Sequence, residues 1–253
     1  AGALLATNRA DPEIDAPNTV GFWEFDARDG LTFSEVVDAT NVPKATVHRL
    51  LRELVDLSAL TYDESTRRYR GGLLLAGLGA SVMRNYDVRR IVRPHLEALH
   101  ELTGSVATLG IRDGEQGIYV DKIEPVGLVI RLHSEIGKSF PLHCTAMGKV
   151  LLAFSNTATI GKVTRRKLQS FTPNTITDGK RLREELEHVA QQGYAVDREE
   201  ITRGLVCIAA PVYGINGNVE AAISCTVSSF DADDRYLAKV RDLVIACAGA
   251  ASG

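Results

Sequence analysis

One stretch decides the fold, Pro43-Lys44-Ala45-Thr46-Val47-His48-Arg49-Leu50-Leu51-Arg52-Glu53-Leu54. Its apolar residues recur at i, i+3, i+4 and i+7, which places one apolar stripe on a helix. Pro43 suits the first helical turn, because its missing N–H removes no bond that the helix would have used. The opposite face is basic and has small residues near its start; it carries Lys44, Ala45, His48, Arg49 and Arg52. Taken alone, this pattern fits an ordinary amphipathic helix with a solvated face as well as a helix that enters a DNA groove.

The preceding segment favours the DNA-binding interpretation. Residues 32–39 predict a short helix that Thr32 or Ser34 can cap, and residues 40–42 form a tight connection into Pro43. Two short helices joined this closely predict a helix-turn-helix whose second helix reads DNA.

A basic hairpin follows the predicted reader helix. Residues 60–62 and 68–70 read as paired strands joined by the polar turn 63–67, which is the pattern of a wing. We expect the reader helix to contact the major groove through Lys44, Thr46, His48 and Arg49. We expect the wing to contact the DNA backbone through Arg67, Arg68 and Arg70.

These residues carry a resemblance to a known family. The segment "PKATVHRLL" at 43–51, followed by "RRYRGG" at 67–72, resembles the winged helix-turn-helix of IclR-type transcriptional regulators. The segments "PLHCTAMGKVLLAF" at 141–154 and "GYAVDREEITRGLVCIAAPV" at 193–212 resemble the effector domain of that family. The resemblance runs from about residue 30 to 227. At the wing tip this chain has Arg67 where the family usually has glycine.

The second half of the chain predicts an α+β domain. Two hairpins are expected across Asp113-Gly114 and Asn216-Gly217, which are strong turn signals. Strands are expected at 106–112, 117–123, 129–132, 206–213 and 219–227, a loop at 137–141, and helices at 87–103, 145–154, 178–192 and 231–248. An antiparallel sheet with helices packed on it follows, and the resemblance implies the GAF/PAS-like architecture. The predicted domains are a loose arm at 1–16, with a candidate helix following at 17–27, the winged helix-turn-helix at 17–72, a linker helix at 73–86, and an effector-binding and oligomerisation domain at 87–253.

A predicted helix start carries the first candidate site chemistry. Residues 143–149 begin a helix, whose unpaired N–H groups and partial positive charge suit a carboxylate. Thr145 can add a hydroxyl to that ligand, with Ala146 and Gly148 leaving room. The alternative is that Thr145 only caps its own helix and the small residues serve packing.

Two predicted strands supply further polar groups. Ser224 and Thr226 are two residues apart and so share one face, as do Cys207 and Ala209 on the partner strand. The resemblance implies a pocket lined by Ala146, Met147, Asp197, Leu205, Cys207, Ser224 and Thr226. Asp197 could accept hydrogen bonds from a ligand hydroxyl or from nearby backbone N–H groups. We expect a small organic acid as effector, with its carboxylate at the helix start and a hydroxyl or carbonyl near Asp197.

Other classes of function compete with this interpretation. Cys207 and His143 could form a nucleophile and its base in an enzyme, or a metal or redox sensor could use them with Cys144. A scaffold without any ligand is a third class. The sequence favours a regulator that is not an enzyme and needs no cofactor.

Charge and composition bear on partners. The 253 residues carry a net charge of −3, yet the segment 43–70 has a small positive excess. This weak excess predicts that two half-sites are needed for useful affinity, hence a homodimer or homotetramer on a near-palindromic double-stranded operator. No apolar run is long enough to cross a membrane, and residues 1–15 do not read as a signal peptide. The four cysteines lack CxxC spacing, so reduced thiols and a cytoplasmic location are expected.

Overall fold

The computed structural model describes residues 30–40, 42–84, 87–125, 134–230 and 233–253. The chain forms two compact units, Ala1–Asn85 and Tyr86–Gly253. The predicted helix at 17–27, the arm at 1–16 and the strand at 129–132 lie outside the described residues.

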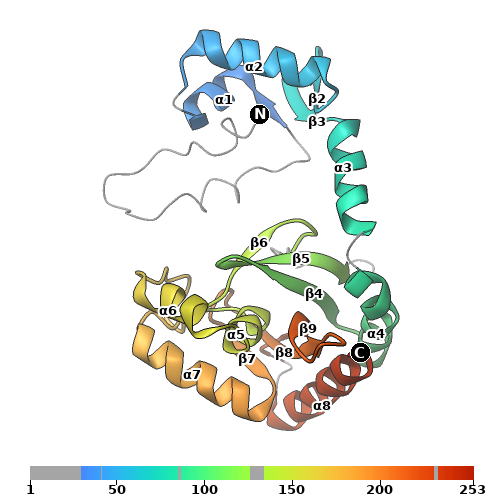
Figure 1. Ribbon diagram of the computed structural model, residues 1–253, viewed down its shortest axis with the longest axis vertical. Helices are drawn as coiled ribbons and strands as arrows, with labels where there is room; N and C mark the ends of the chain where they lie inside the picture. The colour runs from blue at the N-terminus through green and yellow to red at the C-terminus, as the bar shows by residue number, and fades with distance from the viewer. Residues whose placement is uncertain (1–29, 41, 85–86, 126–133, 231–232) are drawn as a thin grey trace. The chain divides into compact units, whose positions relative to one another are not determined.

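The first unit is a helix-turn-helix with a wing, as predicted (Figure 1). Its helices are α1 (Phe33–Thr40), α2 (Lys44–Asp56) and α3 (Leu73–Arg84), and its strands are β1 (Leu31–Thr32), β2 (Leu60–Asp63) and β3 (Arg68–Gly71). The strands form an antiparallel sheet in the order β1-β3-β2. The short strand β1 was not predicted from the sequence.

The apolar stripe of α2 builds the core of this unit. Val47 and Leu51 are buried against Val36 of α1. Pro43 is the N-cap of α2 rather than a residue of its first turn, and its carbonyl accepts hydrogen bonds from the N–H groups of Thr46 and Val47.

Helix α1 begins with a reciprocal cap. The Thr32 N–H donates to Glu35 Oε2 over 2.7 Å, and the Glu35 N–H donates to Thr32 Oγ1 over 3.3 Å. Two otherwise unpaired N–H groups are satisfied in this way. Of the two residues expected as caps, Thr32 has this role.

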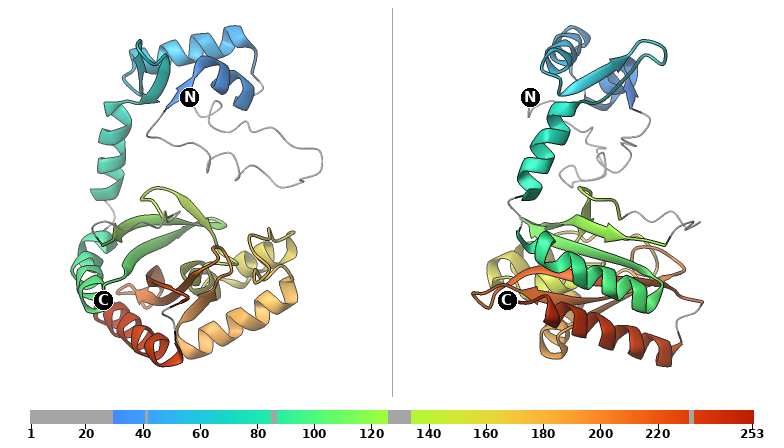
Figure 2. Two further views of the ribbon diagram at one scale, coloured as in Figure 1. Left: turned by 180° about the vertical axis from the view of Figure 1, so that it is seen from behind. Right: turned by 90° about the vertical axis from the view of Figure 1, so that its right-hand side faces the viewer.

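The second unit is a six-stranded antiparallel sheet between two layers of helices (Figures 1 and 2). The strand order is β6-β5-β4-β9-β8-β7. The strands are β4 (Val106–Asp113), β5 (Gln116–Ile123), β6 (Ser139–Pro141), β7 (Ala195–Arg198), β8 (Leu205–Tyr213) and β9 (Val219–Ser228). The helices are α4 (Asp87–Thr103), α5 (Ala146–Ala153), α6 (Thr157–Arg165), α7 (Gly179–Gln192) and α8 (Asp234–Ala250). Helices α4 and α8 cover one face, and α5 covers the other, called the inner face below, with α6 and α7 stacked against α5 and each other.

Both predicted hairpins and the four predicted helices of this unit are confirmed, with three differences. The expected loop at 137–141 contains strand β6, which pairs with β5 at the sheet edge. Helix α6 and strand β7 were not predicted. The last helix begins at Asp234, because the side chain of Asp233 caps it by accepting a hydrogen bond from the Tyr236 N–H.

The start of α4 is fixed to the sheet by a buried carboxylate. The Asp121 side chain is fully buried on β5 and lies 2.8 Å from Arg93 Nη1 and 3.2 Å from Arg89 Nε of α4. A buried charge needs such partners because its desolvation is costly. The first turns of α4 are thereby held on the face opposite α5.

Candidate functional site

The predicted DNA-reading residues lie on α2 and the wing. Lys44, His48 and Arg49 are exposed, whereas Thr46 is half-buried. The guanidinium of Arg49 forms an exposed ion pair of 2.8 Å with Glu53, one helical turn later. Exposed pairs of this kind are weak, so the Arg49 side chain can exchange Glu53 for a DNA group.

The three wing arginines differ in their surroundings. Arg67 is exposed at the turn with a φ of +53°, a left-handed conformation that is strained for a residue with a Cβ. Arg70 Nη2 lies 3.9 Å from Asp63 Oδ2 across the hairpin. Arg68 Nη1 donates to the Gly30 carbonyl over 2.7 Å and lies 3.4 Å from Glu35 Oε2. Arg68 therefore ties the wing to the start of α1, an internal role that the sequence did not predict.

The predicted pocket strands meet on the inner face of the larger sheet. The register places Cys207 opposite both Asp197 and Thr226, and Ser224 opposite both Ala209 and Thr108. Ser224 and Thr226 share one face of their strand and Cys207 and Ala209 share one face of theirs, as expected, and the register shows that both pairs lie on the same face of the sheet. Leu205 lies two residues before Cys207 and belongs to the same face.

Hydroxyl and thiol groups pair along this face. Thr108 Oγ1 lies 2.6 Å from Ser224 Oγ, and Cys207 Sγ lies 3.2 Å from Thr226 Oγ1. Thr108 also donates to Met147 Sδ of α5 over 3.7 Å, which places Met147 above this pair. Thr108 was not predicted from the sequence, although it is a polar residue in an otherwise apolar strand, two residues before Gly110.

Space on the inner face is shaped by Phe140, Met147 and a glycine. A Cβ at Gly110 would lie 2.8 Å from the Phe140 ring and 3.2 Å from Met147 Sδ. Cys207 and Thr226 remain only half-buried, although β8 and β9 each have a neighbouring strand on both sides. Of the polar residues on this face, Cys207 and Thr226 therefore keep some solvent exposure, whereas Ser224 and Thr108 are buried.

The start of α5 limits what Thr145 can do. Thr145 Oγ1 accepts from the Gly148 N–H over 3.0 Å and donates its only proton to the Pro141 carbonyl over 2.8 Å. The capping interpretation is correct, and this arrangement leaves the Thr145 hydroxyl no proton to donate to a ligand. The N–H groups of Ala146 and Met147 have no acceptor within the helix, since they belong to its first turn. They are the groups at this helix start that suit an anion.

Asp197 is a buried carboxylate without a cation in direct contact among the described residues. It is 1% exposed, and its Oδ1 accepts a hydrogen bond of 2.6 Å from the Glu200 N–H. Burial raises the pKa of Asp197 from 3.8 to about 7. The side chain thus exists partly as the neutral acid near neutrality, when it can donate as well as accept.

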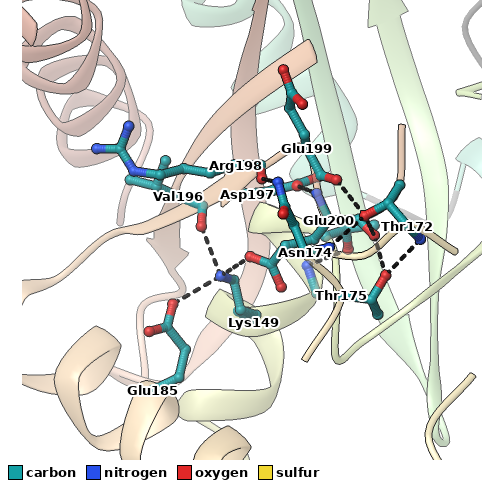
Figure 3. Close-up of polar contacts among 12 residues, drawn as sticks. Lys149, Thr172, Asn174, Thr175, Glu185, Val196, Asp197, Arg198, Glu199 and Glu200 are labelled. Carbon is teal, nitrogen blue, oxygen red and sulfur yellow. Dashed lines mark hydrogen bonds and ion pairs between the residues drawn. The ribbon is translucent and has the colours of Figure 1, made fainter. Parts of the chain in front are cut away.

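A buried lysine near Asp197, not predicted from the sequence, holds three acceptors together (Figure 3). Lys149 of α5 is 1% exposed, and its ammonium donates to Glu200 Oε1 over 2.6 Å, to the Val196 carbonyl over 2.7 Å and to Glu185 Oε1 over 2.8 Å. Its three protons are therefore used, and burial is outweighed by Glu200 and Glu185, which hold the pKa of Lys149 above its usual value. The signal in the sequence was a single cation in a helix that is otherwise apolar on all sides.

Threonine and asparagine side chains hold the turn after β7 in place (Figure 3). Thr172 Oγ1 donates to the Glu199 carbonyl and Thr175 Oγ1 donates to the Glu200 carbonyl, each over 2.6 Å. Asn174 Nδ2 donates to the Arg198 carbonyl over 3.1 Å. These contacts support the left-handed φ of +59° at Glu199. They also hold the Glu200 backbone in place, so that its carboxylate accepts from the Lys149 ammonium.

The structure does not bring the proposed nucleophile and base together. Burial raises the pKa of the Cys207 thiol, whose recorded side-chain partner is Thr226. His143 Nε2 lies 2.9 Å from the Gln169 carbonyl, and burial lowers the pKa of this imidazole. Within the described residues the two side chains share no contact, and no group of three or more His, Cys, Asp or Glu is placed to hold a metal ion. Among the helices of the described chain, none has the length and apolar character needed to span a membrane.

Comparison with known proteins agrees with this geometry. Residues 80–253 match the family model of the bacterial transcriptional regulator IclR C-terminal domain, and residues 25–64 match that of the IclR helix-turn-helix domain. The chain is 32% identical over 203 residues to the DNA-binding transcriptional repressor YiaJ of Escherichia coli, covering 79% of this chain and 72% of that protein. It is 33% identical over 213 residues to the HTH-type transcriptional regulator XynR of the same species, covering 84% of each.

Solved structures show the same architecture. An IclR transcriptional regulator from Alicyclobacillus acidocaldarius matches with a TM-score of 0.79 at 29% identity, over 91% of this chain and 92% of that one. An IclR homolog from Microbacterium hydrocarbonoxydans, complexed with 4-hydroxybenzoate, matches in fold with a TM-score of 0.80 at 21% identity, over 99% of this chain and 95% of that one. With a helix-turn-helix unit, a curled antiparallel sheet unit and both family models matched, this chain belongs to the IclR family of bacterial transcriptional regulators.

Proposed function

We propose that the protein is a ligand-responsive transcriptional regulator that binds a near-palindromic operator and responds to a small organic acid. The observation that carries the effector half is the row of polar side chains on the inner face, which we call the polar seam: Thr108, Ser224, Cys207 and Thr226. Cys207 and Thr226 of this seam stay half-buried. The 4-hydroxybenzoate in the complex of the Microbacterium homolog is a carboxylate with a hydroxyl at its far end, which is the ligand chemistry proposed here. Because the partner is operator DNA, the protein is expected to work in the cytoplasm and to act by binding rather than by catalysis.

The chemistry of the seam suggests how such an acid is held. The carboxylate approaches the free N–H groups of Ala146 and Met147, where the helix dipole favours negative charge. A hydroxyl or carbonyl at the other end of the ligand points toward Asp197, while Leu205 and Cys207 supply less polar walls. Ser224 and Thr226 add hydroxyls from β9, in place of the expected contribution from Thr145.

A thermal-shift screen of small carboxylates, 4-hydroxybenzoate among them, tests this proposal. A ligand that binds only the folded state raises the melting temperature by mass action. Ser224→Ala should weaken the best hit in calorimetry, whereas Thr157→Ala, at an exposed position on α6, should not. Operator binding without ligand should survive Ser224→Ala. Equal ligand affinity in the parent, Ser224→Ala and Asp197→Ala would remove the ligand from this seam.

The assembly half of the proposal rests on α3. Leu73, Leu74, Leu75 and Leu78 of this helix are 85%, 41%, 49% and 54% exposed, respectively. Neighbouring leucines three or four positions apart form one apolar strip on a helix, and such a strip favours cover by another chain. We propose a homodimer through α3, with a homotetramer formed by further contacts of the larger unit.

Light scattering tests the assembly. The parent should exceed the monomer mass at micromolar concentration, and the double variant Leu74→Glu/Leu78→Glu should shift toward monomer. Ile215→Glu is the matched control, since Ile215 is a 96% exposed apolar side chain in the β8–β9 turn. A monomeric parent would refute the dimer.

A further inference from the structure

A groove lies between the reader helix and the wing, and it is lined by residues mostly outside the expected DNA contacts. Its lining is His48, Arg52 and Val55 of α2 together with Tyr62 of β2 and Tyr69 of β3. The lining residues thus come from the middle and the end of the reader helix and from both strands of the hairpin. Figure 1 shows α2 beside β2 and β3.

The charge available in this groove comes from Arg52. Its side chain is exposed, and among the residues that the structure describes its guanidinium has neither an ion pair nor a hydrogen bond. Arg49 and Arg68 differ, since Arg49 is paired with Glu53 and Arg68 with the Gly30 carbonyl and Glu35. An anion can therefore bind the Arg52 guanidinium without displacing an acidic partner.

The tyrosines form a rigid wall with polar ends. Tyr62 and Tyr69 are directly opposite each other in the hairpin, with ring centroids 4.8 Å apart. Tyr69 packs on the core of the unit, while Tyr62 is 43% exposed. Tyrosine hydroxyls and arginine are both common donors to DNA phosphates.

The spacing along α2 places Arg52 where the DNA backbone runs. Lys44, His48 and Arg52 lie at i, i+4 and i+8 and so share one face of the helix. Eight residues rise about 12 Å along the axis, roughly the width of the major groove of B-DNA. If the start of α2 lies in the major groove of the DNA, Arg52 reaches the edge of that DNA groove, where the phosphates lie.

We propose that this helix–wing groove is a phosphodiester-binding site, in which Arg52 pairs with one DNA phosphate and the Tyr62 hydroxyl donates to the same strand. The inference rests on the proposed DNA-binding function and adds a contact that carries no sequence information. Arg52 and Tyr62 position the operator strand between the reader helix and the wing, and the base-reading residues lie nearer the start of α2.

Binding to a duplex of unrelated sequence tests the site directly, because a phosphate contact acts on any DNA. The probe is a fluorescent duplex of mixed sequence spanning three helical turns, measured by anisotropy over a salt series. Each phosphate neutralised contributes a slope of about −0.9 in log K against log salt, so Arg52→Met should lower affinity about eightfold per subunit at 0.1 M salt and flatten the slope by about 0.9 per subunit. Tyr62→Phe should weaken binding and leave the slope unchanged, since it removes a hydroxyl and no charge.

Matched variants separate charge from packing. Arg52→Lys keeps the charge and should restore the slope, and Lys180→Met, at an 86% exposed lysine side chain on α7, should behave as the parent. If Arg52→Met unfolds the unit, circular dichroism will show it, and Arg52→Gln replaces it in the comparison. Parental affinity and slope in the folded Arg52 variants would overturn the groove assignment alone. A parent that binds no duplex at any salt would overturn the proposed function as well.

Discussion

Replacing Lys149 by methionine should strongly destabilise the larger unit. The change keeps an unbranched chain that is only one atom shorter, and it removes the ammonium that donates to Glu200, Glu185 and the Val196 carbonyl. Glu185 has a 29% exposed side chain and can turn to water, whereas the Glu200 side chain is 8% exposed and would stay buried. Removing one partner of a buried pair costs about 3–5 kcal/mol, because the other charge is left uncompensated. For a unit of this size, that loss lowers the melting temperature by roughly 10 °C.

Calorimetry and urea denaturation monitored by circular dichroism measure this loss. Glu200→Gln in the Lys149→Met background removes the orphaned charge, so the double variant should regain a substantial part of the lost stability. Lys180→Met on the exposed face of α7 serves as the control and should leave the free energy of unfolding unchanged. The reasoning fails if Lys149→Met melts within about 3 °C of the parent, a shift of roughly 1 kcal/mol, or if the Glu200 change adds to the damage.

Three further outcomes are expected. Because burial raises the pKa of Asp197 from 3.8 to about 7, the folded state binds its proton more tightly than the unfolded chain, and stability falls as pH rises from about 4 to 7. Asp197→Asn should remove this fall. Melting temperatures that depend on pH in the same way in both proteins would contradict it. Thr145→Ala should lower the free energy of unfolding by about 1 kcal/mol through loss of the α5 cap, as measured by chemical denaturation. Thr145→Ser should retain most of that stability, because it keeps the hydroxyl that accepts from Gly148. Equal losses in both variants would count against the capping role. Gly117→Ala should lower the melting temperature, since a Cβ there would clash with the Phe140 ring. An unchanged melting temperature would show that the ring can move aside.

The strongly periodic elements were accessible from the sequence. Helix α2 is indicated by its apolar stripe. Helix α7 is indicated by Asp178, which caps its start, and by Gly193, whose φ of +79° ends the helix. The hairpin across Asn216-Gly217 follows from a turn signal of the same local kind, with Gly217 at a φ of +74°. Each of these signals lies within a few residues of the element it specifies.

The missed elements depend on distant partners. Strands β1 and β6 contain two and three residues, and their extended form is set by pairing with β3 and β5 rather than by their own composition. Strand β7 is likewise defined by its pairing with β8.

The candidate sites show the same division. Same-face placement of Ser224 and Thr226 follows from the period of a strand, so it was predictable. The pairing of Thr108 with Ser224 and of Lys149 with Glu200 joins residues far apart in the chain, and no local pattern specifies it. The commitment of Arg68 to Gly30 and Glu35 also needed the folded structure, because the arginine pattern of a wing looks alike whether or not its charges are free.

The pairing of β4 with β9 at the centre of the larger sheet has a consequence for biosynthesis. Strand β4 pairs with β9, joining Val106 to Thr226, so the middle of the sheet closes only after nearly the whole chain has been made. Until then the β4–β5 hairpin has an open edge, which invites pairing with other chains. The reader helix and wing depend on no such distant partner and can fold as they leave the ribosome. We therefore expect a chain terminated before β9 to contain a folded DNA-binding unit and an incomplete larger unit. Such a product would bind operators but would not respond to an effector.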